Sequence, residues 1–285
     1  TGTLKIEGKD PKNLGIFGLS KMVGTVLQDT DGQFIGLTVA EDIAFVLEND
    51  CMAQEEMFRK VDDVAETVEV KELLHHAPSE MSGGQKQRVS MAGVMIDDVD
   101  ILLFDEPLAN LDPATGKKAI ALIDRIQKEQ KKTIVIIEHR LEDVLYKDVD
   151  RIVVVGEGTI VADMKPDDLL AGNILKEQGI REPLYVTALK YAGCTIAAED
   201  HPQHVETMNF EPYRAQVGEW FETTKIPQKQ EAEEKVLNVD HLHFSYQPGK
   251  AILSDISFDV KKGEMISIVG RNGAGKTTLS NLICG

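Results

Sequence analysis

Residues 270–277 read GRNGAGKT and fit the pattern G-x-x-x-x-G-K-[ST], a specific short signal for a loop that binds phosphate groups. The pattern needs a strand before it and a helix after it, and the apolar run 265–269 and the helical spacing of 276–283 are typical of both. A chance glycine-rich turn is the alternative. Glycines let backbone N–H groups approach phosphate oxygens, and the start of the following helix adds the positive end of its dipole. We expect nucleotide contacts from Gly270, Asn272, Gly273, Gly275, Lys276, Thr277 and Thr278.

Within this loop, two side chains have distinct expected roles. Lys276 should reach the β- and γ-phosphates, and the hydroxyl of Thr277 should bind Mg²⁺. Upstream, Tyr246 stands where a ring could stack on adenine, although it could also be an ordinary strand aromatic. The loop therefore predicts ATP and Mg²⁺ as ligands.

A second motif, MSGGQKQR at residues 81–88, predicts the start of a helix. Ser82 as N-cap and Gln85 three residues later form a capping box. Gly83 and Gly84 have no side chains, so that a γ-phosphate could approach the backbone N–H groups of the first helical turn. A plain helix cap with structural glycines is the alternative. We expect nucleotide contacts from Ser82, Gly83, Gly84 and Gln85.

A third motif, ILLFDEP at residues 101–107, is a buried strand that ends in two acids. Open α/β sheets bind ligands at the carboxyl ends of their strands. Asp105 suits a contact to Mg²⁺, and Glu106 suits polarising an attacking water molecule. Paired acids at a strand end are otherwise often only solvated.

The rest of the chain alternates between strand-like and helical segments. Residues 4–7, 23–27, 100–104 and 133–137 favour strands; residues 39–47, 54–68 and 113–127 favour helices; residues 151–155 and 159–161 favour a hairpin. Residues 164–234 are rich in proline, with helical pieces at 167–170 and 185–192, and we interpret them as an insert or structured linker. Strands return at 236–244, 252–260 and 265–269. The alternation predicts a parallel sheet covered by helices.

Composition excludes several classes. The 285 residues contain no apolar run of the roughly 20 residues that a spanning helix needs. Three scattered cysteines argue against a disulfide framework or a zinc site. A formal net charge of −17 disfavours nucleic acid as a large-surface partner.

The order of these motifs resembles that of the ABC ATPases. Gln28 matches the glutamine loop of that family, residues 110–113 (NLDP) match its D-loop, and His139 matches its switch histidine. His139 alone would more often be a strand-end histidine without a role. The resemblance implies a P-loop NTPase cassette of ABC type, an α/β fold with a mostly parallel sheet, a helical signature subdomain and antiparallel β elements. It implies catalytic roles for Glu106, His139 and Gln28, nucleotide contact by Asp112, and Mg²⁺ binding by Thr277, Asp105 and Gln28.

The motifs also predict a domain organisation. Residues 1–163 resemble a first cassette without its phosphate loop, 164–234 the linker, and 235–285 the start of a second cassette. We expect an internal fragment of a tandem protein whose two cassettes pair head to tail. An alternative hypothesis is one circularly permuted cassette, in which residues 235–285 fold back into the first sheet and place Lys276 beside Asp105.

A narrower resemblance is to the energy-coupling-factor importers of vitamins, cobalt or nickel. It rests on residues 28–34 (QDTDGQF), 37–45 (LTVAEDIAF) and the linker segment 179–193. It implies a transmembrane scaffold subunit and a substrate-binding membrane subunit as partners, at the cytoplasmic face of the membrane. Four acids near Gln28 would give the scaffold an acidic docking groove, or merely form a solvated face: Asp29, Asp31, Glu41 and Asp42.

Three alternatives fit less well. A soluble tandem ATPase acting on ribosomes should have a basic linker, whereas residues 164–234 hold seven Lys/Arg against thirteen Asp/Glu. A DNA-repair ATPase needs a long coiled coil, and no heptad run is present. A drug exporter needs spanning helices, and no apolar segment separates the two predicted cassettes.

Overall fold

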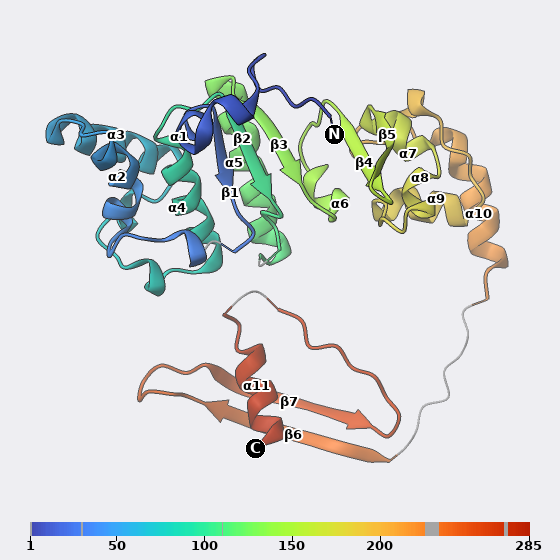
Figure 1. The fold of residues 1–285 in the computed structure, drawn as a ribbon. Coiled ribbons are helices and arrows are strands. Elements are labelled where there is room, and N and C mark those ends of the chain that lie inside the picture. Colours follow the sequence, from blue (N-terminus) through green and yellow to red (C-terminus); the bar gives the residue numbers. More distant parts are fainter. Residues whose placement is uncertain (1, 30, 110, 226–233, 271–272) are drawn as a thin grey trace. The chain divides into compact units, whose positions relative to one another are not determined.

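The computed structural model describes residues 2–29, 31–109, 111–225, 234–270 and 273–285 (Figure 1). The chain divides into two compact units, Thr1–Glu222 and Thr223–Gly285.

The first unit is built on a three-stranded parallel sheet. Its strands are β1 (Val23–Val26), β2 (Ile101–Asp105) and β3 (Thr133–Ile137), in the order β1-β2-β3. The register pairs Val26 with Phe104 and Phe104 with Ile136. Phe104 is completely buried, which explains why β2 reads as a nearly continuous apolar run. The sheet confirms the parallel α/β class and these three predicted strands.

Helices share one hydrophobic core with the face of this sheet that carries Leu102, Phe104 and Ile136, whereas Val135 and Ile137 of β3 are 45% and 50% exposed. The main ones are α2 (Val39–Asn49), α3 (Gln54–Thr67), α4 (Gly83–Met95) and α5 (Pro113–Gln130). On α2, Val39, Ile43 and Leu47 are buried at a spacing of four residues, as an amphipathic helix requires. Helix α4 packs against both α2 and β1. Shorter elements are η1 (Pro11–Asn13), α1 (Gly15–Ser20), η2 (Asp31–Gln33), η3 (Lys71–Leu73) and η4 (Pro78–Glu80).

The remainder of the first unit has a second core of its own. It contains α6 (Leu141–Val144), the antiparallel hairpin β4 (Ile152–Gly156) and β5 (Thr159–Met164), α7 (Pro166–Ala171), α8 (Ile174–Glu177), α9 (Leu184–Tyr191), η5 (Ala198–Asp200), η6 (Glu211–Tyr213) and α10 (Arg214–Thr223). Leu169, Leu170 and Val186 are fully buried there. Residues 164–222 are therefore packed structure within the first compact unit, and the domain boundaries expected at 163 and 234 stay predictions.

The described residues of the second unit form a long hairpin and a helix. Strands β6 (Lys235–Phe244) and β7 (Leu253–Lys261) pair antiparallel, and α11 (Lys276–Cys284) follows. The pairing and the helix confirm the predictions for 236–244, 252–260 and 276–283.

Two predicted strands are wrong. Residues 265–269 form no strand, and Met265 and Val269 are 90% and 83% exposed. A parallel strand needs a neighbour for its backbone hydrogen bonds, and β6 and β7 pair with each other. Residues 4–7 likewise form only part of a tight turn closed by a bridge between Ile6 and Lys9. The fold-back hypothesis stays a prediction.

Candidate functional site

The predicted site residues fall into two groups, one in each unit. Gln28, residues 82–85, Asp105, Glu106, Asp112 and His139 belong to the first unit; Tyr246, Gly270, Gly273, Gly275 and residues 276–278 belong to the second. Asn272 lies outside the described residues, as does Asn110 of the NLDP segment.

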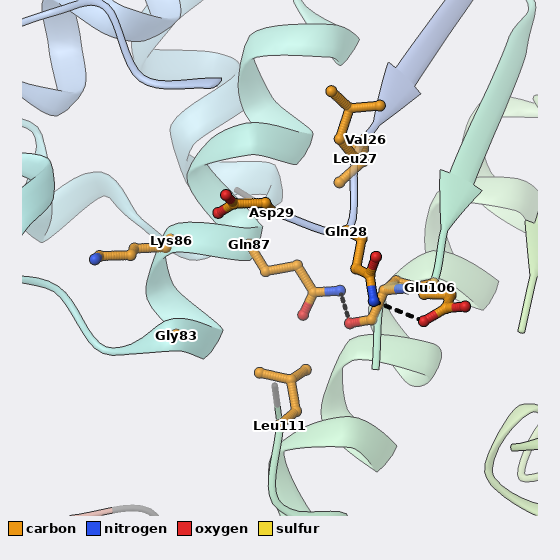
Figure 2. Close-up of a pocket in the computed structure, with 10 residues that line it drawn as sticks. Val26, Leu27, Gln28, Asp29, Gly83, Lys86, Gln87, Glu106 and Leu111 are labelled. Carbon is orange, nitrogen blue, oxygen red and sulfur yellow. Dashed lines mark hydrogen bonds between the residues drawn. The ribbon is translucent and has the colours of Figure 1, made fainter. Parts of the chain in front are cut away.

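The carboxyl ends of the three parallel strands bring Gln28, Glu106 and His139 together. Gln28 follows β1, Glu106 follows β2 and His139 follows β3, so all three lie at one edge of the sheet. Nε2 of Gln28 donates a hydrogen bond of 2.8 Å to Oε2 of Glu106 (Figure 2). Nδ1 of His139 lies 3.9 Å from Oε1 of the same carboxylate. The three residues expected to be catalytic thus form one cluster around Glu106.

The backbone of Glu106 adopts an unusual conformation. Its φ is +47°, in the left-handed region that non-glycine residues rarely occupy. The N–H of Glu106 donates to the carbonyl of Ile137 at 2.9 Å, and the N–H of Ala109 donates to the carbonyl of Glu106 at 3.1 Å. Such strain persists where the surroundings fix it, and it is concentrated at functional sites.

A cavity of about 260 Å³ opens beside this cluster (Figure 2). Gln28 and Glu106 line one part of it, while Gly83 and Lys86 line another from the start of α4. Nε2 of Gln87, which is almost completely buried, donates to the carbonyl oxygen of Pro107 on the wall between them. The strand ends and the first turn of α4 therefore face a common space.

The start of α4 has the predicted capping box. The N–H of Ser82 donates to Oε1 of Gln85 at 2.8 Å, and the N–H of Gln85 donates to Oγ of Ser82 at 3.4 Å. At Gly84 the structure adds a packing reason for glycine, since a Cβ there would lie 2.6 Å from Cγ2 of Thr115 on α5. Nucleotide contact by residues 82–85 stays a prediction.

Asp112 has a local structural role. Its Oδ1 accepts from the N–H groups of Ala114 and Thr115 at 3.1 Å, and its Oδ2 accepts from Oγ1 of Thr115 at 2.8 Å. Asp112 is therefore the N-cap of α5. Its expected contact with nucleotide stays a prediction beside this role.

In the second unit, the described part of the phosphate loop has the geometry of a glycine turn. Gly273 and Gly275 have φ values of +79° and +88°. A Cβ on Gly275 would also lie 2.8 Å from Cδ2 of Leu253, so this position excludes larger residues. Nζ of Lys276 donates a hydrogen bond of 2.8 Å to the carbonyl oxygen of Gly270, so the first residue of the motif is bonded to its lysine.

Tyr246 lies close to the helix that follows this loop. Its hydroxyl is 3.4 Å from Oγ1 of Thr278, and its ring packs edge-to-face on Phe244 with centroids 4.9 Å apart. The side chain of Tyr246 is still 66% exposed. An exposed ring next to the phosphate loop is compatible with the predicted adenine stacking.

The expected Mg²⁺ ligands are chemically suited to that ion. Asp105, the amide oxygen of Gln28 and the hydroxyl of Thr277 are hard oxygen donors, which Mg²⁺ prefers. The hydrogen bond to Glu106 uses the Nε2 atom of Gln28, so its amide oxygen remains available for the ion. Among the described residues, no cluster of three or more His, Cys, Asp or Glu side chains could hold a metal ion by itself.

Sequence reasoning missed three residues at this site: Gln87, Glu138 and Arg140. Each makes a side-chain hydrogen bond to the backbone of residues 107–108. Glu138 and Arg140 directly flank His139, and Gln87 lies in the motif at 81–88. Their positions beside motif residues were the available signal, but the partner atoms are 20 to 32 residues away in the sequence.

Family comparisons define the class of protein. A family profile described as "ABC transporter" matches residues 1–109 and 253–285. A second profile, described as "ATP-binding cassette cobalt transporter", matches residues 172–244. The chain belongs to the ATP-binding proteins of the ABC transporter family, as its motifs, parallel sheet and strand-end cluster indicate.

Individual relatives are consistent with this class. The chain is 55% identical to a provisionally named ABC transporter ATP-binding protein of Clostridium perfringens and 53% identical to one of Photobacterium profundum, over 285 residues in each case. These alignments cover 100% of this chain and 50% of each relative, so the chain spans about half the length of the curated relatives it matches.

Solved structures of the same class resemble this one. CbiO1 of Clostridium perfringens, described as part of the ABC transporter complex CbiONQ, matches with a TM-score of 0.58 and 28% identity, over 67% of this chain and 76% of that one. The dimeric bacterial ABC cassette MJ0796 matches with a TM-score of 0.51 and 26% identity, over 58% and 73%. Both confirm the cassette fold.

Proposed function

We propose that the chain is part of an ATP-hydrolysing subunit that powers a membrane importer of the energy-coupling-factor type. The observation that carries the proposal is the cluster of Gln28, Glu106 and His139 at the carboxyl ends of β1, β2 and β3. Glu106 is a carboxylate held by an amide on one side and near an imidazole on the other. This is the arrangement that a base for polarising water beside a γ-phosphate requires.

The chemistry assigned to each residue follows from its atoms. Glu106 orients the attacking water, Gln28 holds the Glu106 carboxylate in place, and His139 contributes a ring nitrogen near the γ-phosphate. The full-length protein would have two nucleotide sites. Asp105 and Gln28 would hold Mg²⁺ in one of them, and Thr277 would hold Mg²⁺ in the other. The ion would neutralise charge on the phosphate oxygens. Phosphoryl transfer depends mainly on positioning and charge, so each site works only when fully assembled.

The assembly that we propose is a head-to-tail pair of cassettes in the full-length protein. Residues 82–85 would then close on the nucleotide held by Lys276 and Thr277, and Glu106 and His139 would act at the second composite site. The solved cassette MJ0796 is described as dimeric, which supports pairing. The curated relatives are about twice as long as this chain, which leaves room for two complete cassettes.

A transition-metal cargo, cobalt or a related ion, is favoured over a vitamin. The profile that matches residues 172–244 is described as belonging to a cobalt transporter, and CbiO1 is described as part of the CbiONQ complex. By analogy, the partners are a transmembrane scaffold and a substrate-binding membrane subunit, and the protein is peripheral at the cytoplasmic face. No helix among the described residues is long and apolar enough to cross a membrane.

A second cavity of about 160 Å³ is a candidate docking position for the scaffold. It is lined by Gln33, Ile35, Asp42, Phe45, Val46, Ser90, Gly93 and Val94. Two of the four acids expected near it, Glu41 and Asp42, have local partners, however. Oε2 of Glu41 accepts from the N–H groups of Leu37 and Thr38, and Oδ1 of Asp42 accepts from those of Ile35 and Gly36. Both carboxylates stabilise the start of α2, which favours a groove recognised by its shape and apolar lining.

The ribosome-acting alternative is less well supported. A protein that holds RNA with its linker needs clustered Lys and Arg. Two of the basic side chains in that segment are already paired with acids: Lys190 with Glu182 and Arg181 with Glu142.

The test uses the full-length protein co-expressed with its membrane partners. Wild type should hydrolyse Mg-ATP and drive uptake of labelled Co²⁺. Glu106→Gln should lower ATP turnover by about 10²–10⁴-fold with ATP affinity retained, since the phosphate-binding residues are unchanged. Normal turnover in the Glu106→Gln protein would reject the assignment. Uptake of a labelled vitamin in place of Co²⁺ would reject the metal cargo alone.

A further inference from the structure

Leu108 has an unusual pair of backbone partners. Its N–H donates to Oε2 of Glu138 at 3.3 Å, and its carbonyl oxygen accepts from Nη1 of Arg140 at 2.8 Å. Glu138 and Arg140 are the two residues on either side of His139. The two residues that flank the histidine therefore bind the backbone N–H and the carbonyl oxygen of Leu108, whose side chain is completely buried.

Glu138 is a buried carboxylate that uses both of its oxygens. Its side chain is 2% exposed. While Oε2 accepts from Leu108, Oε1 accepts from the N–H groups of His139 and Arg140 at 3.0 and 3.2 Å and lies 3.2 Å from Nδ1 of His139. Burying a carboxylate is costly unless hydrogen bonds compensate. Three backbone donors provide that compensation, and the same bonds fix the direction of the His139 segment.

The contact reaches Glu106 because the next residues are also held. The N–H of Glu106 donates to the carbonyl of Ile137 at the end of β3, and Pro107 accepts from Gln87 of α4. Residues 106, 107 and 108 are thus fixed in succession by β3, by α4 and by the residues flanking His139. Glu106 has little freedom to move without His139.

We propose that Glu138 and Arg140 are positioning residues that clamp the His139 segment to the turn carrying Glu106, so that base and histidine keep one fixed geometry. The clamp rests on the proposed ATP hydrolysis and adds two residues to its machinery. Both act through Leu108 on Glu106 and through the backbone on His139. Displacement of a reacting group by about 1 Å lowers a rate by about 10²-fold, so the clamp should affect turnover strongly.

The experiment compares steady-state ATP hydrolysis of the full-length protein with and without the clamp. Glu138→Gln keeps the side-chain size but replaces one acceptor oxygen with an NH₂ group that cannot accept from an N–H. Arg140→Gln removes the donor to the carbonyl oxygen of Leu108. This second variant tests the clamp if the Glu138→Gln protein does not fold. Glu142→Gln is the matched control, since Glu142 lies on α6, is 40% exposed and has its carboxylate 3.7 Å from Nη2 of Arg181.

Glu138→Gln should lower kcat by roughly tenfold or more, and Arg140→Gln by a smaller factor, with KM and the affinity for a fluorescent ATP analogue within about twofold of wild type. Glu142→Gln should match wild type. A purely structural role would not separate kcat from nucleotide affinity in this way. In a Glu106→Gln background, Glu138→Gln should lower the residual rate by no more than about twofold, because the clamp acts by keeping the base and His139 in one relative geometry, and that geometry no longer matters once the base is lost.

Each remaining outcome has a definite meaning. If Glu106→Gln abolishes turnover while Glu138→Gln and Arg140→Gln leave kcat unchanged, the clamp is wrong and the proposed function stands. An undiminished further loss in the Glu106→Gln background would show that Glu138 acts independently of Glu106, which also overturns the clamp. If Glu106→Gln itself leaves turnover unchanged, the proposed function fails, and the clamp fails with it.

Discussion

The side-chain amide of Gln28 lies 2.8 Å from the carboxylate of Glu106, although the two residues are 78 positions apart in the chain. Parallel pairing of β1 with β2 creates this contact, because it aligns the carboxyl ends of the strands that precede each residue. The contact links the segment after β1, which borders the candidate docking cavity through Gln33 and Ile35, to the proposed catalytic base.

Gln28→Ala should lower ATP turnover of the full-length protein by about tenfold, since a hydrogen bond to a charged group contributes about 1.5–3 kcal/mol and Glu106 is partly exposed. Gln28→Glu should be more harmful, because it places a second carboxylate against Glu106. Steady-state kinetics check both. Gln54→Ala, on the exposed start of α3, is the control, and equal rates in all four proteins would contradict the proposed role.

Lys276→Ala should weaken nucleotide binding at the second unit by roughly tenfold or more, because a charge-assisted hydrogen bond to phosphate is lost. Titration with a fluorescent ATP analogue measures this. Lys250→Ala removes an exposed lysine from the same unit and should leave affinity unchanged. If the two variants bind equally well, Lys276 does not hold phosphate.

Gly84→Ala should destabilise the protein by about 1–3 kcal/mol, since its Cβ would lie 2.6 Å from Cγ2 of Thr115. Adding Thr115→Ser should restore much of the loss, because serine removes that methyl group but keeps the hydroxyl that bonds to Asp112. Thermal unfolding compares the variants. Gly93→Ala, where nothing lies within 4 Å of a new Cβ, should be neutral or slightly stabilising, and a similar loss there would exclude steric crowding as the cause.

Tyr185 should ionise late in the folded protein. Burial, reinforced by the charges of Glu206 and Glu142, raises the pKa of Tyr185 from 10.0 to about 12. Its hydroxyl lies 2.6 and 2.9 Å from the carbonyl oxygens of Pro202 and Gln203, and these contacts require the neutral form. Since the folded pKa is above the unfolded one, this stabilisation is complete below pH 10 and is lost as the pH rises through 12.

Tyrosinate absorbance at 295 nm measures this ionisation. Tyr185→Phe should remove a late-titrating phase from the alkaline titration of the folded protein. Tyr191→Phe, which removes a phenol that is 72% exposed, should leave that phase in place. An unchanged late phase in the Tyr185→Phe protein would contradict the assignment.

Local patterns in the sequence predicted most of the elements and the motif positions. The capping box of Ser82 and Gln85, the burial of β2 and the glycine turn before Lys276 depend on residues close together in the chain, so sequence order alone reveals them. The strand expected at 265–269 was wrong because a strand depends on a partner elsewhere in the chain. Its apolar character was read correctly, but a strand exists only when another strand bonds to it.

The sequence by itself determined the class of protein and the identity of the residues at the strand ends, because each motif is short and its chemistry lies in its residue types. Only the tertiary structure decided what those residues touch. The bonds from Glu138 and Arg140 to Leu108 span about 30 residues, and the contact between Gly84 and Thr115 spans two helices. Such contacts depend on how parallel strands and their covering helices bring distant segments together, and no local pattern encodes that distance.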